Sequence, residues 1–551
     1  MFEEQELRTL LEKSRIHLGL LLTVAVSLPI LLHFFEYFPN GWDQTEYSWC
    51  IQSDYLPHSP YILFFILGKF FHLFLAPPVA LATLSLFSGL ASLGLFYFVN
   101  YRLFSPHFQE QKSAFAAWSL PTMATMLVGW SYLFIRQGSS QDTYVTLTFM
   151  VLLAISFLLT RIRGKAVYSG LVFGCALAIH NGALFILPVM VYTLLTVEQE
   201  RRVRSLRHWL LAVAITCAFF CFLIYLILPV SPGGNHWREY IAYLRGISPG
   251  LELRELLKPQ FWANSIKALF PRLLSLEIPS TRWPAATSPV GFSLLYLLVA
   301  AIGLAISFGR YFRQALLWLL WAAPYLLYEV ALDLNLDYGI YLPFLLPPLA
   351  VFATIAILSL VGYRGSRISR YISITVRGLL VFLLLLPSGA LIVRHWDDPV
   401  KDAVAHFSPS TLAAIWASRH LPTAALVIQS RAEWNVNILP YYARRQHVLW
   451  TGQELVLFQD IGRYTPMNIH SYTLLTTAML KGIIASGRPV YAFESNPLKD
   501  CDPAILDGKA FTWEAGAVAD LDAVESLLTV PQSVRDQLPR GTITLYQGRL
   551  K

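Results

Sequence analysis

Charged residues are scarce in this sequence. Only 14% of its 551 residues are Asp, Glu, Lys or Arg, whereas about a quarter are charged in an average soluble domain. Hydrophobic residues make up 55%, and apolar runs long enough to cross a bilayer recur from Leu18 to Val393. This composition excludes an ordinary soluble protein and indicates an integral membrane protein with many spans.

Cysteine is also rare. The five cysteines are scattered and odd in number, which excludes a disulfide framework and the usual zinc-ligand spacings. Cys217 and Cys221 lie one helical turn apart, but in an apolar segment without His or acidic neighbours. We therefore expect them to pack and not to bind a metal. Internal repeats and low-complexity stretches are absent as well.

The apolar runs predict about eleven transmembrane helices. Arg8, Lys13 and Arg15 precede the first run as in a signal peptide, but that run is long and no small-residue cleavage site follows it, so we expect a retained first span. We place the spans at 17–35, 79–99, 113–134, 143–160, 166–181, 183–197, 209–229, 289–308, 314–331, 339–361 and 378–394.

The formal net charge of +8 reflects membrane topology, not nucleic-acid binding, because the basic residues lie in short loops between apolar runs. A cytoplasmic N-terminus puts every basic loop on the cytoplasmic side. These loops contain Arg102 and Lys112; Arg161, Arg163 and Lys165; Arg201, Arg202, Arg204 and Arg207; Arg310 and Arg313; Arg364, Arg367, Arg370 and Arg377.

Two apolar segments have a length that does not fit one membrane span. The segment 61–76 is short and contains Lys69 and His72, and counting it as a span would put the later basic loops outside. We therefore predict a helix on the outer membrane surface. The run 166–197 is too long for one span, and His180-Asn181-Gly182 interrupts it, so we predict two spans joined by a turn.

Three regions are expected outside the membrane: 36–78, 230–288 and the tail 395–551. In the tail, apolar runs stop and helix-like and strand-like segments alternate. We predict helices at 409–420 and 470–486 and strands at 424–429, 489–493 and 542–546. The predicted fold is an all-α polytopic membrane domain at 1–394 followed by an extracytoplasmic α/β domain at 395–551.

The first outside loop contains two carboxylates and two basic groups, at Asp43, Glu46, His58 and Lys69. A carboxylate can accept a proton from an attacking hydroxyl, and a cation can neutralise a phosphate leaving group. The alternative is that these are ordinary solvated residues of a loop.

Other polar residues adjoin the predicted spans. Arg136 and Asp142 lie in the second outside loop, and Asp142 suits either a helix N-cap or a catalytic site. His180 and Asn181 interrupt apolar sequence, where polar groups are often functional, although capping of the two adjoining helices explains them as well. Asp337 and Tyr338 likewise suit a cap first and a site second.

The order of several motifs resembles the GT-C glycosyltransferases, and most closely the transmembrane-protein-260-like family. These motifs are Asp43-x-x-Glu46, His58-Ser59-Pro60-Tyr61, Leu67-Gly68-Lys69, Tyr101-Arg102-Leu103-Phe104, Gly174-Cys175-Ala176-Leu177-Ala178-Ile179-His180-Asn181 and Asp337-Tyr338-Gly339-Ile340-Tyr341-Leu342-Pro343. That family has a glycine between the two acids, where this chain has Gln44-Thr45. The likeness covers about 20–360.

The resemblance implies transfer of a sugar from a polyprenyl- or dolichyl-phosphate-linked donor to a protein, lipid or glycan acceptor on the extracytoplasmic face. It implies Asp43 as the base at the acceptor hydroxyl, with Glu46 as the alternative base, and Asp142 as the second-loop acid. It places Lys69, with Arg136 and His58, at the donor phosphate. No cofactor is implied, although some relatives use a divalent metal. We expect a bacterial inner membrane protein that contacts membrane lipids.

Two other functions fit a polytopic membrane protein. A transporter would usually have ionisable groups near the bilayer midplane and inverted repeats, whereas the acids here gather outside the predicted spans. An inactive scaffold would keep the fold and use its tail to bind partners.

Overall fold

The computed structural model describes the parts of the chain on which all structural statements below rest. These are residues 2–39, 42–52, 61–110, 114–197, 202–228, 235–238, 240–241, 258–260, 263, 277–279, 287–289, 294–331, 345–360, 367–422, 424–429, 447–450, 455–458, 472–474, 476–493, 510–528 and 530–551.

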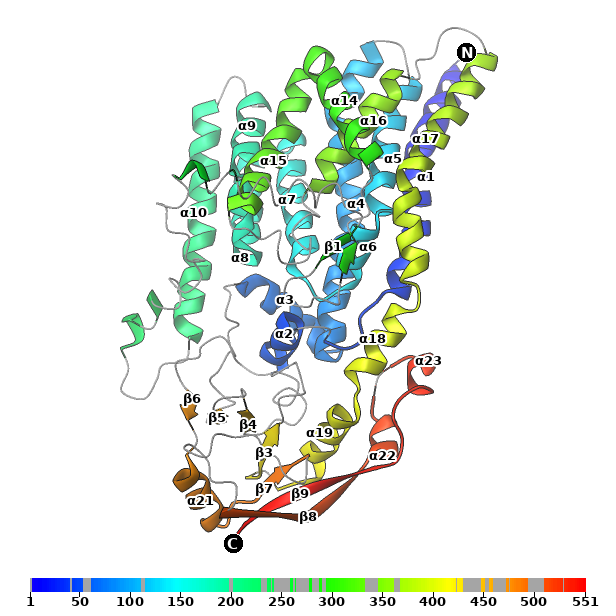
Figure 1. Cartoon of the computed structure of the whole chain (residues 1–551). Helices are drawn as coiled ribbons and strands as arrows, with labels where there is room; N and C mark the ends of the chain where they lie inside the picture. The colour runs from blue at the N-terminus through cyan, green and yellow to red at the C-terminus, as the bar shows by residue number, and fades with distance from the viewer. Residues whose placement is uncertain are drawn as a thin grey trace.

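A bundle of long helices makes up most of the structure (Figure 1). A helix occurs at each of the eleven predicted spans. They are α1 (Phe2–His33), α4 (Pro77–Glu110), α5 (Ala114–Gly129), α7 (Thr143–Leu159), α8 (Lys165–Ile179), α9 (Leu187–Val197), α10 (Arg202–Ile227), α14 (Leu294–Arg310), α15 (Phe312–Ala331), α16 (Leu346–Leu360) and α17 (Arg367–Arg394).

Length and apolar character single out a smaller set as able to cross a membrane. Among the described residues these are three segments, Pro77–Pro106, Arg202–Ile227 and Ile372–Arg394. A fourth candidate is the pair Tyr132–Ser139 and Thr143–Leu159, which bends by 102°. The apolar helices support an integral membrane protein, and the count of eleven spans stays a prediction.

The described basic residues Arg102 and Arg313 lie at the same end of the bundle, because the side-chain amide of Gln314 donates to the carbonyl oxygen of Leu103 over 3.1 Å. The guanidinium of Arg102 donates to the carbonyl oxygen of Leu159 over 3.0 Å. The hydroxyl of Tyr192 donates to the backbone carbonyl oxygen of Arg313 over 3.1 Å. The opposite end carries two short helices and the sheet of the tail (Figure 1). This separation agrees with the predicted topology, while the side of the membrane on which each end lies stays a prediction.

Glycines allow the helices of the bundle to pack closely. A Cβ atom on Gly303 of α14 would overlap the carbonyl oxygen of Phe352 on α16. A Cβ atom on Gly170 of α8 would lie 2.5 Å from the carbonyl oxygen of Trp209 on α10. Small residues at such crossings are typical of helix pairs in membranes, because dispersion contacts hold them together there.

The structure differs from the sequence prediction at the end of the fifth helix. The predicted span 113–134 ends at Gly129, because the hydroxyl of Ser131 accepts a hydrogen bond from the amide of Phe134 over 3.2 Å. This N-cap starts a separate short helix, α6 (Tyr132–Ser139). The chain then turns sharply into α7, so that a corner forms at residues 139–143.

The first outside loop contains two helices. A helix is present where the surface helix was predicted, namely α3 (Ile62–His72), whose 11 residues are too few to cross a bilayer. Its place on the outer membrane surface stays a prediction. It is preceded by α2 (Trp42–Gln52), which the sequence analysis treated as loop. The predicted turn between 166–181 and 183–197 is also present, and it forms the 3₁₀ helix η1 (Asn181–Ile186).

The tail contains helices and a mixed sheet. Its helices are α18 (Asp398–His406), α19 (Pro409–His420), α21 (Thr477–Ala485), α22 (Leu521–Glu525) and α23 (Gln532–Arg535). The described strands β3 (Leu426–Gln429), β4 (His447–Trp450), β5 (Leu455–Phe458), β6 (Tyr472–Leu474), β7 (Val490–Ala492), β8 (Phe511–Asp520) and β9 (Thr542–Leu550) form one sheet in the order β6-β5-β4-β3-β7-β9-β8. Strand β3 pairs in parallel with β4 and β7, and the other pairs are antiparallel.

The helix predicted at 470–486 begins later than expected. Residues Tyr472–Leu474 form the edge strand β6, and the helix starts only after Thr476, whose hydroxyl accepts from the amide of Met479 over 3.3 Å. A separate hairpin, β1 (Glu277–Pro279) with β2 (Thr287–Pro289), lies in the second large loop. The domain boundary at 394/395 and the placement of the tail outside the membrane stay predictions.

Candidate active site

The corner between α6 and α7 is buried at the end of the bundle that faces the tail. Asp142 is the N-cap residue of α7 by position, as the sequence suggested. Its carboxylate, however, accepts no hydrogen bond from the first turn of α7 within the described structure. The hydroxyl of Ser85 on α4 instead donates to the backbone carbonyl of Asp142 over 3.0 Å. The backbone of the corner is therefore held by α4, and the carboxylate of Asp142 does not serve as the cap.

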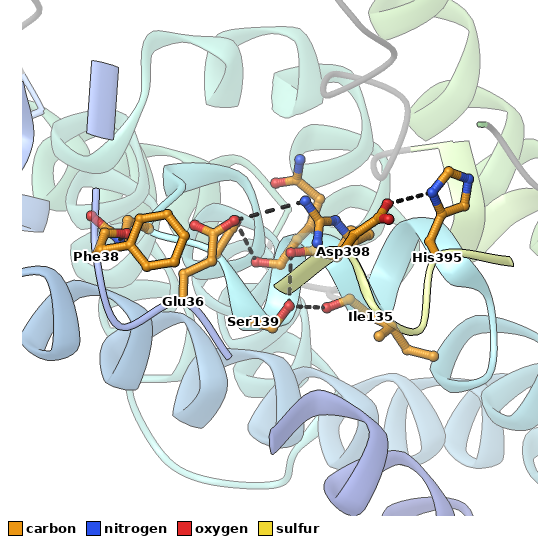
Figure 2. Close-up of polar contacts among 10 residues, drawn as sticks. Glu36, Phe38, Ile135, Ser139, His395 and Asp398 are labelled. Carbon is orange, nitrogen blue, oxygen red and sulfur yellow. Dashed lines mark hydrogen bonds and ion pairs between the residues drawn. The ribbon is translucent and has the colours of Figure 1, made fainter. Parts of the chain in front are cut away.

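Gln141 ties the two outside loops together. Its side-chain amide donates to the carbonyl of Phe38 over 2.7 Å, and its side-chain oxygen accepts from the hydroxyl of Ser48 on α2 over 3.0 Å. The amide of Glu36 donates to the carbonyl of Ser139 over 3.1 Å (Figure 2). The first loop thus packs directly on the corner that carries Asp142.

Most of the acids proposed from the sequence lie beyond what the structure describes. Asp43 and Glu46 are in the backbone of α2, and their side chains lie outside the described part. His58, Asp337 and Tyr338 lie outside the described residues. The structure nevertheless brings the helix that carries Asp43 and Glu46 against the corner that carries Asp142, because Ser48 of α2 contacts Gln141.

Arg136 has a partner that the sequence analysis missed. Its guanidinium lies 3.9 Å from the carboxylate of Glu36, an ion pair drawn as a dashed line at Glu36 in Figure 2. It also lies 5.8 Å from the centre of the Phe34 ring. Glu36 is only 8% exposed. The available signal was an acid directly after the long apolar run of α1, where an ionisable group often has a function.

Burial raises the pKa of the Glu36 carboxyl from its ordinary value to about 8. The positive charge of Arg136 opposes this rise, and the nearby acids Asp142 and Asp402 add to it. The main cause is that a buried site disfavours the charged form of a carboxyl group. Glu36 is therefore a group that can hold or release a proton near neutral pH, next to the corner of Asp142.

His180 lies at the centre of an aromatic cluster. Its Nδ1 accepts a hydrogen bond from the amide of Gly182 over 2.9 Å, which confirms the predicted capping role at the break. Its ring stacks on Tyr61 at 4.8 Å and lies 5.0 Å from the ring of Tyr144. Asn181, the other residue singled out there, is half-buried at the start of η1. The cluster links the start of α3 to the start of α7, two residues after Asp142.

Lys69 is half-buried on α3. The preceding residue, Gly68, lies where α3 meets α2 and α4, since a Cβ atom there would overlap Ile51 and lie 3.0 Å from Leu81. Lys69 is thus on the helix that packs against the one carrying Asp43 and Glu46. Its predicted contact with a phosphate stays a prediction.

Metal ligands do not cluster in the described part of the chain, where no group of three or more His, Cys, Asp or Glu side chains could hold an ion. The expectation that the protein needs no cofactor stays a prediction.

Comparison with known proteins gives a likeness of fold. No protein-family model matches the sequence, and no curated protein matches it, so the resemblance to the transmembrane-protein-260-like family is not shown. The oligosaccharyltransferase of Archaeoglobus fulgidus in its apo form is 11% identical, with a TM-score of 0.50 over 78% of this chain. The chain spans 64% of the length of that protein.

Two further structures are similar. The oligosaccharyltransferase AglB of A. fulgidus, in complex with an inhibitory peptide and a dolichol-phosphate, is 11% identical, with a TM-score of 0.50 over 86% of this chain and 69% of that one. ArnT of Cupriavidus metallidurans bound to undecaprenyl phosphate is 13% identical over 96% of this chain and 97% of that one; its TM-score of 0.48 is too low to establish a shared fold by itself. The chain is therefore similar in fold to the oligosaccharyltransferase AglB of A. fulgidus.

Proposed function

We propose that this protein is a glycosyltransferase that moves a sugar from a polyprenyl- or dolichyl-phosphate-linked donor to a hydroxyl of a protein, lipid or glycan on the extracytoplasmic face. The fold supports the proposal, because the similar protein AglB has a structure in complex with a dolichol-phosphate. Fold alone does not define chemistry, so the proposal depends on the site.

The observation that carries it is the bridge at Gln141. This side chain joins α2, which bears Asp43 and Glu46, to the corner that bears Asp142. Helix α3, which bears Lys69, packs beside α2. Acids and a cation are thus supplied by neighbouring elements at one end of an apolar bundle, where the phosphate group of a membrane lipid would lie.

In the proposed reaction the acceptor oxygen attacks the anomeric carbon of the donor sugar. The bond from that carbon to the phosphate oxygen breaks, and the lipid phosphate leaves with the bonding electron pair. Asp43 takes the proton of the acceptor hydroxyl, with Glu46 as the alternative base. Lys69, assisted by Arg136 and His58, balances the charge on the leaving phosphate.

Arg136 can take part without losing its present partner. A guanidinium has five N–H donors, and the described contact to Glu36 spans 3.9 Å. The Arg136 guanidinium can therefore bind a phosphate while it keeps its contact with Glu36. The neighbouring Glu36, whose pKa is raised to about 8, is mostly neutral near pH 7 and therefore does not repel the phosphate.

Replacing Asp43 by Asn tests the proposed base. The substitution keeps the shape of the side chain and removes the proton acceptor, so turnover should fall by about 10²–10⁴-fold while donor binding changes little. The measurement is sugar transfer by the purified protein from a polyprenyl-phosphate-linked sugar. Glu46→Gln is the matched control and should reduce turnover less than Asp43→Asn does.

Other outcomes would reassign the chemistry. A larger loss in Glu46→Gln than in Asp43→Asn makes Glu46 the base. Normal transfer in both variants moves the chemistry to Asp142. Substrate uptake into vesicles without any transfer would favour the transporter.

Lys69 provides a second test. Lys69→Ala should weaken use of the donor more than Lys69→Arg, because arginine keeps the charge that a phosphate requires. The readout is the KM for the donor. Lys165→Ala, at the start of α8, is the control and should behave as wild type. Equal effects of the two Lys69 substitutions would mean that geometry matters and charge does not.

A further inference from the structure

An apolar groove of about 1000 Å³ lies between α1, α5 and α17. On α17 its lining runs from Ile374 to Arg394. At 1.5 Å per residue this length is roughly 30 Å, which matches the hydrocarbon thickness of a bilayer. Helix α17 is also one of the helices long and apolar enough to span a membrane.

The groove is open because glycines flatten the face of α17. A Cβ atom on Gly378 or on Gly389 would meet no described atom within 4 Å, and both residues line the groove. Helix α17 instead contacts the bundle elsewhere, for example through Leu391, which packs with Leu31 and Phe34. A space with such apolar walls suits a hydrocarbon chain from the surrounding membrane much better than water.

A cation lies toward one end of the groove. Arg377 is 7% exposed and lines it, as Trp118 and Ser119 of α5 also do. A guanidinium binds phosphate through two parallel hydrogen bonds, and its five donors allow it to do so beside the contacts that it already makes. Arg367 and Arg370 precede it on α17, so this is the basic end of the bundle.

We propose that this groove binds an anionic phospholipid from the leaflet at the basic end. The phosphate pairs with Arg377, and an acyl chain follows α17 past Gly378 toward Gly389. Anionic headgroups are the lipid partners that basic residues at a membrane surface attract.

The proposed phosphate position at Arg377 is distant from the candidate active site. Helix α17 packs against α5, α6 and α16, and among these α6 carries Arg136 of the candidate site. Arg377 is 17 positions before Arg394 on α17, or roughly 26 Å along the axis. The end of α17 near Arg394 contacts α6, because Leu391 packs with Tyr132 and Ile135. The proposal is therefore independent of the proposed function.

Lipid retention by the full-length protein tests the proposal. The protein is reconstituted in vesicles of phosphatidylglycerol and phosphatidylethanolamine with a trace of undecaprenyl phosphate, extracted in mild detergent, and its bound lipids are counted by native mass spectrometry. Wild type should retain phosphatidylglycerol. Arg377→Gln should bind it about tenfold more weakly, because a charge-assisted bond is lost.

A second variant blocks the space for the acyl chain of the lipid and leaves the charge of Arg377 in place. Gly378→Leu places an apolar side chain in the groove, at a position where a Cβ atom meets no described atom within 4 Å, so it should also displace phosphatidylglycerol. The matched controls are Arg310→Gln and Gly309→Leu on α14, where a Cβ atom at 309 likewise meets no described atom within 4 Å. Both controls should retain the lipid as wild type does.

Three results would overturn the proposal. The first is equal retention of phosphatidylglycerol by wild type, Arg377→Gln and Gly378→Leu. The second is retention of phosphatidylethanolamine as strong as that of phosphatidylglycerol. The third is retention of undecaprenyl phosphate in its place, which would make the groove a site for the donor lipid.

Discussion

Glu36 lies where the chain leaves α1, beneath the guanidinium of Arg136 and beside the corner that carries Asp142. Burial and the two nearby acids raise the pKa of the Glu36 carboxyl, and the nearby cation lowers it. Burial has the largest effect on this pKa. Within the described structure, its Oε2 atom has no hydrogen-bond partner. The neutral form is therefore favoured up to about pH 8.

This pKa predicts how stability depends on pH. In the unfolded chain the Glu36 carboxyl has its ordinary pKa of 4.5, and in the fold the pKa is about 8. The folded state thus binds the proton more tightly, so the contribution of Glu36 is fully present below 4.5 and is lost as pH rises through 8. Each pKa unit corresponds to about 1.4 kcal/mol.

Glu36→Gln removes this titration. The thermal midpoint of wild type should fall relative to that of the variant as pH rises from about 5 to about 8. Thermal unfolding of both proteins in the same detergent measures the difference. Because Arg136, Asp142 and Asp402 are present in both, their own titration largely cancels. Parallel pH profiles of the two proteins would show that Glu36 ionises normally in the fold.

The contact between α14 and α16 shows how closely two helices of the bundle approach. At Gly303 the backbone of α16 occupies the place that a side chain would need. At Gly309, six residues later on the same helix, an added Cβ atom would meet no described atom within 4 Å. The same substitution should therefore have opposite effects at the two positions.

Gly303→Ala should destabilise the protein by several kcal/mol, since backbone atoms must move to admit one methyl group. Gly309→Ala should be neutral or stabilising by up to about 1 kcal/mol, because alanine favours helix more than glycine does. The measurement is the thermal midpoint of each variant in detergent. A stable Gly303→Ala protein would mean that α14 and α16 lie farther apart than described.

At the scale of the whole molecule, the tail is attached to the bundle through the end of α1. His33 stacks on Trp396 at 3.6 Å, and Phe38 packs on Phe407 with ring centres 5.8 Å apart. Asp402 adds charge near Glu36 from the side of the tail. A small cavity of about 190 Å³ lies at this contact, between Glu36 and Val534 of the tail.

The bundle geometry predicts the sidedness of the chain. The described basic residues Arg102 and Arg313 lie at one end and the tail at the other (Figure 1), and basic loops remain in the cytoplasm. Reporter fusions after Ile368 and after Asp398 should therefore report opposite sides of the membrane. A fusion after Arg163 is the control and should agree with the one after Ile368. Signals from the same side at 368 and 398 would contradict the predicted topology.

The sequence by itself determined where the long apolar helices lie, but not the short helices α2 and α6. A helix satisfies its backbone hydrogen bonds internally, so an apolar run and its caps specify it locally. This is why a helix lies within or across each predicted span, and why the break at His180 and the start of α7 after Asp142 were predicted correctly. Strand β3 at Leu426–Gln429 was found by the same local signals.

Only the tertiary structure decided which polar groups meet. The Glu36–Arg136 pair and the Gln141 bridge join residues that are about a hundred positions apart, and their burial depends on the packing of α1, α2, α4 and α6 together. The groove beside Arg377 likewise depends on the space that α5 leaves along α17. Such contacts have no local sequence signal, because side-chain burial and ion pairing are set by the elements that surround a residue and not by its neighbours in the chain.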